Sequence, residues 1–307
     1  MPATMPATFT MSITPFRSDG SIDEGLLREH LRFQAEAGVG VCLCSQGSGE
    51  GDLLSMEERL RVYEIGVDEL KGRVPVYAAG IGLAHSTERI VTLAKDACKI
   101  GVDAVYVLGP RPGALVPRAA EIEAYYREVI EAIECSVAVS NNTALAGYSF
   151  STELIESLIS DYAHVSEILI ADNVGPLISQ VHRLANRFGD AITIRVGMSN
   201  QSILAHAAGA SGILNFEANI APNLTEGMWQ ALLTGQSDKA LSLFANFVEL
   251  HLLCARFGNP RVIKEALRLI GRDGGHLRRP HLPLTAQESA ELGDGLSRLQ
   301  LDNSQPL

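Results

Sequence analysis

The feature that most constrains the fold is a regular alternation of short apolar runs with longer amphipathic segments. Runs rich in Val, Ile and Ala, typical of buried strands, lie at residues 10–15, 40–45, 74–79, 104–108, 137–140, 167–170, 193–197 and 212–216. Between them, apolar residues at three- and four-residue spacing predict helices over residues 23–37, 56–70, 86–100, 118–134, 151–160, 175–188 and 201–208. Since no two strands are adjacent in sequence, the strands must run parallel, and their number predicts an α/β fold of the closed (β/α)8 TIM-barrel type.

A doubly wound open sheet is the competing architecture, but no GxGxxG phrase follows the first strand. After the eighth strand, helical patterns over residues 226–233, 238–256 and 261–270 predict appended C-terminal helices. We therefore expect a barrel over residues 1–222, a helical layer packed on it over residues 223–291, and a polar tail over residues 292–307. No linker separates these parts.

Charge and hydropathy exclude several classes of partner. Asp and Glu outnumber Lys and Arg by 36 to 25, for a net charge of -11, which gives no electrostatic reason to expect nucleic acid or an anionic membrane. No apolar run approaches the roughly 18 residues that a membrane span needs, and the N-terminus lacks the basic and apolar regions of a signal peptide. These patterns favour a cytoplasmic protein.

The cysteines favour neither a disulfide framework nor a metal site. Their odd count, five, argues against a framework of disulfides. Cys42 and Cys44 share one face of a predicted strand, where free cysteines are usually packing residues. CxxC, HxH and HExxH patterns are absent, so we expect no metal and no cofactor.

Several phrases together resemble the dihydrodipicolinate synthase / N-acetylneuraminate lyase family of pyruvate aldolases. They extend over residues 10–285 and comprise Thr14-Pro15-Phe16 with 19–23, Gly47-Ser48-Gly49-Glu50 with 54–59, 209–213 with 219–222, Asn259-Pro260 with 264–267, and Arg278-Arg279-Pro280. The resemblance implies a barrel with C-terminal helices, a small keto acid or related carboxylate as substrate, and a homo-oligomer, either a tetramer or a dimer. It also implies chemistry through an imine between pyruvate and a lysine on the sixth strand.

The sequence departs from the family pattern at the residues that perform this chemistry. By the resemblance, the lysine position falls on Leu169, the proton-relaying tyrosine on Ser140, and the carboxylate-binding arginine on Leu145. The family's Thr-Thr pair is replaced by Gly47-Ser48.

The loss of the lysine does not depend on that alignment. All five lysines lie on predicted helices or helix ends, at positions 71, 95, 99, 239 and 264. An amine that attacks a carbonyl must reach the cavity and be partly deprotonated, which usually requires burial. None of the five is placed for this role.

Three residues near strand ends are our catalytic candidates, because active sites of such barrels lie at the carboxyl ends of the strands. Glu217 would share a face with Ile213 and Asn215 and lie at the cavity rim as an acid/base group, or it is a rim charge. Glu167 would point inward below Leu169, either as a site carboxylate or as a structural ion pair with Arg195. Ser140 offers a hydroxyl to a carbonyl or carboxylate, but without an adjacent His it is not expected to be a nucleophile.

The remaining candidates are substrate-binding residues in the same loops. Arg111 can clamp an anion or be an ordinary exposed arginine, and Asp172 can bind a ligand or cap a helix. We also expect ligand contacts from Gly47, Ser48, Asn141, Asn142, Leu169 and Asn215.

The sequence thus predicts an enzyme repurposed from imine chemistry to acid/base and oxyanion-type catalysis, with lyase, hydratase or cyclisation chemistry open. Two alternatives remain. One is a non-catalytic homologue that binds a ligand or a partner protein, and the other is an ordinary aldolase that uses an unexpected lysine.

Overall fold

The computed structural model describes residues 5–83, 85–111, 115–299 and 301, and it has the predicted barrel. Its eight strands follow one another in sequence order round a closed barrel. They are β1 (Thr8–Met11), β2 (Gly40–Leu43), β3 (Val76–Leu83), β4 (Ala104–Pro110), β5 (Ser136–Asn142), β6 (Val165–Ala171), β7 (Thr193–Val196) and β8 (Gly212–Asn215). The main helices between them are α1 (Glu24–Glu36), α2 (Met56–Leu70), α3 (Thr87–Ile100), α4 (Ala119–Glu131), α6 (Thr152–Asp161), α7 (Val174–Phe188) and α8 (Ser202–Ala207).

Local capping explains why several helix ends were predictable. Ser55 accepts a hydrogen bond from the Glu58 N–H at 3.1 Å, and the Glu58 carboxylate accepts one from the Ser55 N–H at 2.8 Å. This reciprocal capping box satisfies two backbone donors that the first turn of α2 leaves open. Gly101 ends α3 with a φ of 96°, a conformation that glycine adopts without steric cost.

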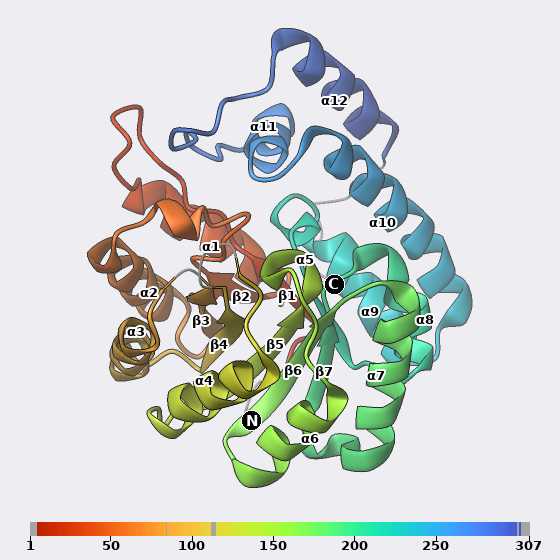
Figure 1. Ribbon diagram of the computed structural model, residues 1–307. Helices are drawn as coiled ribbons and strands as arrows, with labels where there is room; N and C mark the ends of the chain where they lie inside the picture. Colours follow the sequence, from red (N-terminus) through yellow and green to blue (C-terminus); the bar gives the residue numbers. More distant parts are fainter. Residues whose placement is uncertain (1–4, 84, 112–114, 300, 302–307) are drawn as a thin grey trace. The chain divides into compact units, whose positions relative to one another are not determined.

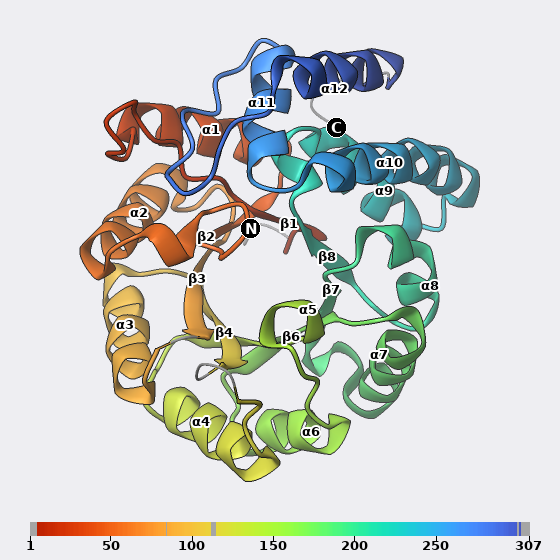
Figure 2. The ribbon, with the colours of Figure 1, turned by 45° about the horizontal axis from the view of Figure 1, so that its top comes forward.

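The chain divides into two compact units, which we describe separately. Unit 2 comprises residues 77–214. Its strands pair in parallel in the order β3, β4, β5, β6, β7 and β8, and Figure 2 shows α3, α4, α6 and α7 lying outside these strands. One side of each strand therefore packs on helices, and the other side faces the interior of the barrel.

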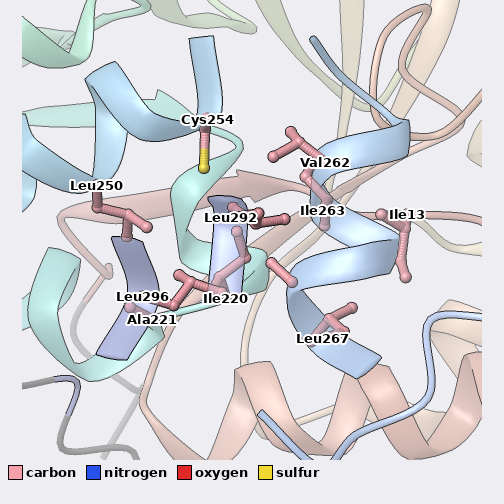
Figure 3. Packing of buried hydrophobic residues seen from close by; sticks show 11 residues of the cluster. Ile13, Ile220, Ala221, Leu250, Cys254, Val262, Ile263, Leu267, Leu292 and Leu296 are labelled. Carbon is pink, nitrogen blue, oxygen red and sulfur yellow. The ribbon is translucent and has the colours of Figure 1, made fainter. Parts of the chain in front are cut away.

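Unit 1 comprises residues 1–76 and 215–307. It contains the parallel pair β1 and β2 together with four C-terminal helices (Figure 1), which are α9 (Pro222–Leu233), α10 (Ser237–Phe257), α11 (Arg261–Leu269) and α12 (Ala286–Arg298). An apolar cluster joins these helices to the loop after β1 through Ile13, Leu250, Ile263 and Leu292 (Figure 3).

The prediction that a polar tail begins at residue 292 is wrong, because α12 continues to Arg298. Leu292 and Leu296 lie one helical turn apart on α12 and are buried in this cluster. Thr285 and Glu288 form a capping box that begins the helix. The outer face of this helix is polar, which is why the sequence suggested a polar tail. Residues 302–307 lie outside the described part of the chain.

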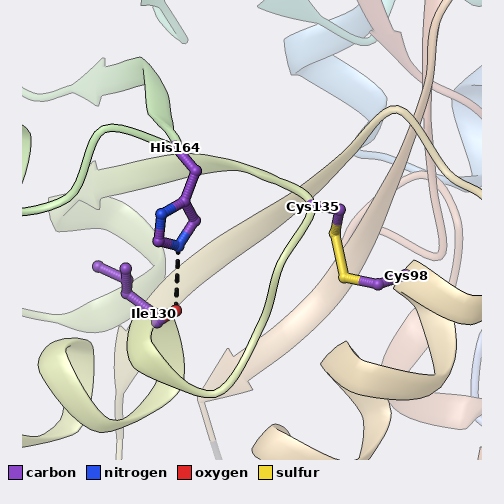
Figure 4. The surroundings of a disulfide bond; sticks show 4 residues. All are labelled: Cys98, Ile130, Cys135 and His164. Atoms are coloured by element: carbon purple, nitrogen blue, oxygen red, sulfur yellow. Dashed lines mark hydrogen bonds between the residues drawn. A yellow bond between two sulfur atoms is a disulfide. The ribbon is translucent and has the colours of Figure 1, made fainter.

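The structure also corrects the expectation for the cysteines. Cys98 on α3 and Cys135 just before β5 form a disulfide, with their Cα atoms 5.7 Å apart (Figure 4). They lie 37 residues apart in sequence, so only the fold reveals their proximity, and an odd count does not exclude a single bridge. Cys42, Cys44 and Cys254 are free and buried, as expected for the first two.

One helix is long and apolar enough to cross a membrane. Among the described residues this helix is α10, and the core helix of a soluble protein can have the same length and composition. Only 22% of its most apolar window is buried, so α10 exposes more apolar surface than a core helix would.

Candidate active site

The inner face of the strands in unit 2 is identified by a contact between strands that are not neighbours. The Tyr77 hydroxyl on β3 donates to a carboxylate oxygen of Glu167 on β6 at 3.1 Å. Because β3 and β6 are not neighbours, their side chains can meet only on the face that points into the barrel. Because side chains alternate along a strand, Leu169 and Ala171 face inward with Glu167, as predicted.

The strand register extends this assignment to the neighbouring strands. Leu169 lies level with Ser140 on β5 and with Arg195 on β7. Residues at one level of adjacent parallel strands share a face, so Ser140 and Arg195 also face inward. Ser140, Leu169 and Arg195 are all buried.

Ser140 belongs to a pair of buried hydroxyls. Its Oγ lies 2.7 Å from the Tyr106 hydroxyl on β4, and either oxygen can donate. The backbone carbonyl of Ser140 accepts a hydrogen bond from the Tyr126 hydroxyl on α4 at 2.9 Å. The serine is thus fixed from both sides, with its hydroxyl beside that of a tyrosine.

Sequence reasoning missed Tyr106. The sequence did contain evidence for it, because residues 104, 106 and 108 are two apart and therefore share one face of the predicted fourth strand. The only candidate that the sequence analysis names here is Arg111, in the loop that follows this strand.

Glu167 forms an ion pair with Arg195, as the structural alternative of the two interpretations proposed. The guanidinium Nε lies 3.0 Å from the carboxylate, and both side chains are almost fully buried. Burial raises the pKa of Glu167, while Arg195 and the Tyr77 hydrogen bond partly oppose this. The structure therefore provides the partner that a buried carboxylate requires.

The two asparagines at the end of β5 have structural hydrogen bonds. The Asn141 side-chain amide donates to Ser149, Gln180 and the Phe150 carbonyl. The Asn142 side chain accepts from the Leu145 N–H at 3.1 Å and caps the short helix α5 (Thr143–Ala146). Both residues thus shape the loop after β5.

Arg111 reaches this loop from the end of β4. Its guanidinium is exposed and donates to the Leu145 carbonyl at 3.0 Å. Leu145 is the position to which the family resemblance assigns a carboxylate-binding arginine. Arg111 therefore places a guanidinium group beside the loop after β5.

Asp172, at the end of β6, accepts a hydrogen bond from the Asn173 N–H at 2.7 Å and is largely buried. The N-cap of α7 is Asn173, so Asp172 does not cap this helix as the alternative interpretation held.

In unit 1, the loop after β2 is bound to the C-terminal segment. The buried Ser48 hydroxyl accepts a hydrogen bond from the Asn259 amide at 2.8 Å. A Cβ at Gly47 would lie 3.2 Å from the same amide nitrogen. The two residues that replace the Thr-Thr pair thus pack against the chain between α10 and α11.

Lys264 is the one buried lysine, and its ammonium group has three acceptors. Nζ donates to a carboxylate oxygen of the buried Glu50 at 2.6 Å, to the Thr14 carbonyl at 2.9 Å and to the His276 carbonyl at 2.7 Å. Burial lowers the pKa of Lys264, and Glu50 opposes that shift. An ammonium group has three N–H donors, so all of them are used here.

The other four lysines are exposed, and all five lie in the described part of the chain. Lys95 and Lys99 lie on α3, Lys239 lies on α10, and Lys71 is the C-cap of α2. None of the five is on a strand, as predicted.

Glu217 does not lie where strand alternation placed it. β8 ends at Asn215, and Glu217 begins a 3-10 turn, η4 (Glu217–Asn219). Its fully buried carboxylate lies 2.6 Å from Nδ1 of His251 on α10. The expectation of a cavity-rim residue is therefore wrong, because the turn redirects this side chain toward the C-terminal helices.

Asn215 has a local role in the same turn. Its side-chain oxygen accepts a hydrogen bond from the Ala218 N–H at 3.3 Å, and the residue is buried. It therefore helps to fix the end of β8.

Comparisons with known proteins agree with this architecture. The family model for the dihydrodipicolinate synthetase family matches residues 5–299. A 4-hydroxy-tetrahydrodipicolinate synthase from Trichlorobacter lovleyi is 30% identical over 280 residues, which cover 91% of this chain and 93% of that protein.

Two solved structures extend the comparison. A putative dihydrodipicolinate synthetase from Pseudomonas aeruginosa superposes with a TM-score of 0.87 at 27% identity, covering 97% of this chain and 100% of that one. YagE from E. coli K12, solved in complex with pyruvate, has a TM-score of 0.88 at 24% identity, with 97% and 100% of the two chains covered. The chain therefore belongs to the dihydrodipicolinate synthetase family, within the aldolase and lyase superfamily.

Proposed function

We propose that this family member is an enzyme that acts on a small keto acid or related carboxylate without forming a lysine imine. The observation that carries the proposal is the placement of the five lysines. Four are exposed on helices or a helix end, and the fifth is buried in an ion pair with Glu50. The inward position on β6 to which the resemblance assigns the lysine is occupied by Leu169, which cannot form an imine.

Lys264 is unsuited to the missing role despite its burial. A nucleophilic amine needs a free electron pair on nitrogen, so Lys264 would have to lose a proton and leave Glu50 buried without its counterion. The loss of a partner from a buried pair costs about 3–5 kcal/mol. The ion pair therefore favours the charged, non-nucleophilic form.

The Tyr106–Ser140 hydroxyl pair is our candidate for the chemistry that remains. Two linked hydroxyls can donate a hydrogen bond to a carbonyl oxygen and stabilise the negative charge that develops on it. They can also pass a proton to or from the substrate. Because the Tyr126 hydroxyl holds the Ser140 carbonyl, the pair is fixed in advance of substrate binding.

Arg111 is our candidate for binding the substrate carboxylate. A guanidinium group can hold a carboxylate with two parallel hydrogen bonds, and its contact with the Leu145 carbonyl uses only Nη1. We assign Glu167 and Arg195 to maintaining the charge balance inside the barrel rather than to direct contact with substrate.

The test begins with thermal-shift screening of the protein against pyruvate and other 2-keto acids, because a ligand that binds the folded state raises its melting temperature. For a ligand that is turned over, Tyr106→Phe should lower kcat about 10²-fold or more, the loss typical when one oxyanion donor is removed. Tyr125→Phe is the control, since Tyr125 is also a buried tyrosine of unit 2 but lies on α4.

Equal kcat values for Tyr106→Phe and the wild type would contradict the assignment of the hydroxyl pair. A ligand that binds tightly and is not turned over would instead favour the non-catalytic, ligand-binding alternative.

A further inference from the structure

A hydrogen bond from Tyr148 fixes the backbone that carries Arg111. Tyr148 lies in the loop after β5, and its hydroxyl donates to the carbonyl of Pro110, the last residue of β4, at 2.7 Å. The carbonyl oxygen of Pro110 and the Cα of Arg111 belong to the same planar peptide unit. A contact that holds this oxygen therefore also fixes the point from which the Arg111 side chain extends.

The place of the Tyr148 hydroxyl depends on the absence of a side chain at Gly109. A Cβ at this position would overlap with the Tyr148 hydroxyl and would lie 3.4 Å from the Tyr126 hydroxyl. The two hydroxyls hold different atoms. Tyr126 donates to the Ser140 carbonyl, whereas Tyr148 donates to the Pro110 carbonyl. The hydroxyl pair at Ser140 and the backbone at Arg111 thus have separate supports.

A second hydrogen bond joins the same two loops in the opposite direction. Arg111 donates from Nη1 to the carbonyl of Leu145 at 3.0 Å, and Leu145 lies on α5, which Asn142 caps. Helix α5 contacts β4, and Figure 2 shows it inside the ring of outer helices. Within the described part of the chain this is the one hydrogen bond of the Arg111 guanidinium, so most of its N–H groups remain available to a ligand.

Tyr148 keeps its proton at neutral pH. Its side chain is half-buried, and burial raises the pKa of Tyr148 to about 12, because a phenolate is poorly solvated there. The hydroxyl therefore remains a neutral donor to the Pro110 carbonyl under the conditions in which a keto acid is ionised.

We infer that Tyr148 is a positioning residue that prepares Arg111 to hold the carboxylate of a 2-keto acid. The inference rests on the proposed function, because it takes Arg111 as the group that binds this carboxylate. A long arginine side chain loses conformational freedom when a ligand orders it. The contacts of Tyr148 with Pro110 and of Arg111 with Leu145 remove part of that freedom before the ligand arrives, which lowers the cost of binding.

Isothermal titration calorimetry with the 2-keto acids of the thermal-shift panel, beginning with pyruvate, tests the inference. Tyr148→Phe should raise the Kd of the bound keto acid about 3- to 10-fold, the contribution of one neutral hydrogen bond, while the melting temperature stays near that of the wild type. For a keto acid that is turned over, KM should rise and kcat should not change, because the hydroxyl pair keeps its own support from Tyr126.

A double-mutant cycle shows whether Tyr148 acts through Arg111. Arg111→Gln should raise the same Kd at least about 10-fold, since it removes a hydrogen bond between charged groups. Adding Tyr148→Phe to Arg111→Gln should have no further effect, because the guanidinium that Tyr148 positions is then absent. A structural role that is independent of Arg111 would instead add its loss in the double variant.

Tyr162→Phe is the matched control. Tyr162 is also a half-buried tyrosine of unit 2, and its hydroxyl donates to the Glu131 carboxylate. It lies just before β6, at the opposite end of the strands from the loop that holds Tyr148. Its substitution should therefore leave the Kd of the keto acid unchanged.

The outcomes separate this inference from the proposed function. If Arg111→Gln raises the Kd but Tyr148→Phe does not, or if the two losses add, the positioning role is wrong and the carboxylate site at Arg111 stands. If the wild type binds no 2-keto acid, or if Arg111→Gln leaves the Kd unchanged, the proposed function fails at this site and the inference fails with it.

Discussion

Lys264→Met is expected to lower the free energy of unfolding by about 3–5 kcal/mol, the cost of removing one partner from a buried ion pair. The substitution leaves Glu50 buried opposite a thioether and leaves the Thr14 and His276 carbonyls without a donor. Urea denaturation measures the loss directly.

Two further variants make this result specific. Lys95→Met, which removes an exposed lysine from α3, should change stability by less than about 0.5 kcal/mol. Adding Glu50→Gln to Lys264→Met should recover part of the loss, because the unpaired charge is then removed. A loss in Lys264→Met no larger than in Lys95→Met would show that Lys264 is not held as described.

Arg195→Met is expected to destabilise the protein by a similar amount, about 3–5 kcal/mol at neutral pH, because Glu167 would remain buried without its guanidinium. The double variant Glu167→Gln/Arg195→Met should be much closer to the wild type, since replacing a whole buried pair by neutral groups is often nearly neutral. Chemical denaturation of the two variants and the wild type provides the comparison.

The pH dependence of this loss follows from the raised pKa of Glu167. A carboxyl group whose pKa is higher in the folded than in the unfolded state favours folding when protonated, and this contribution is lost as pH rises through the folded-state pKa. Removing Arg195 takes away the strongest opposing influence, so the deficit of Arg195→Met should be largest at neutral pH and should decrease on acidification. A deficit that grows on acidification would contradict the assignment.

The barrel could be predicted from the sequence because its signals are local. Each strand is a short apolar run, and capping groups such as Ser55 with Glu58 mark where helices begin. The errors arise where distant parts of the chain decide the structure. Only the fold brings Cys98 near Cys135, and only packing against the cluster at Leu250 reveals that Leu292 is buried.

Residues of the candidate site could be predicted where side chains alternate regularly along a strand. Leu169 and Glu167 face inward because β6 remains regular through both residues. Glu217 was misplaced because β8 ends at Asn215, and nothing in the local sequence marks the 3-10 turn that follows. Tyr106 was missed because it lies in the middle of β4, whereas the candidates from that part of the sequence lie after the strand. Its long side chain nevertheless reaches Ser140 on the neighbouring strand.

The most direct test of the central claim is borohydride reduction in the presence of pyruvate, followed by mass spectrometry of the intact protein. Borohydride converts an imine into a stable amine, so an enzyme that forms one with pyruvate gains mass permanently. The placement of Leu169 and the ion pair of Lys264 predict no added mass on this protein. A stoichiometric adduct that maps to Lys264, or to any of the other four lysines, would contradict the account.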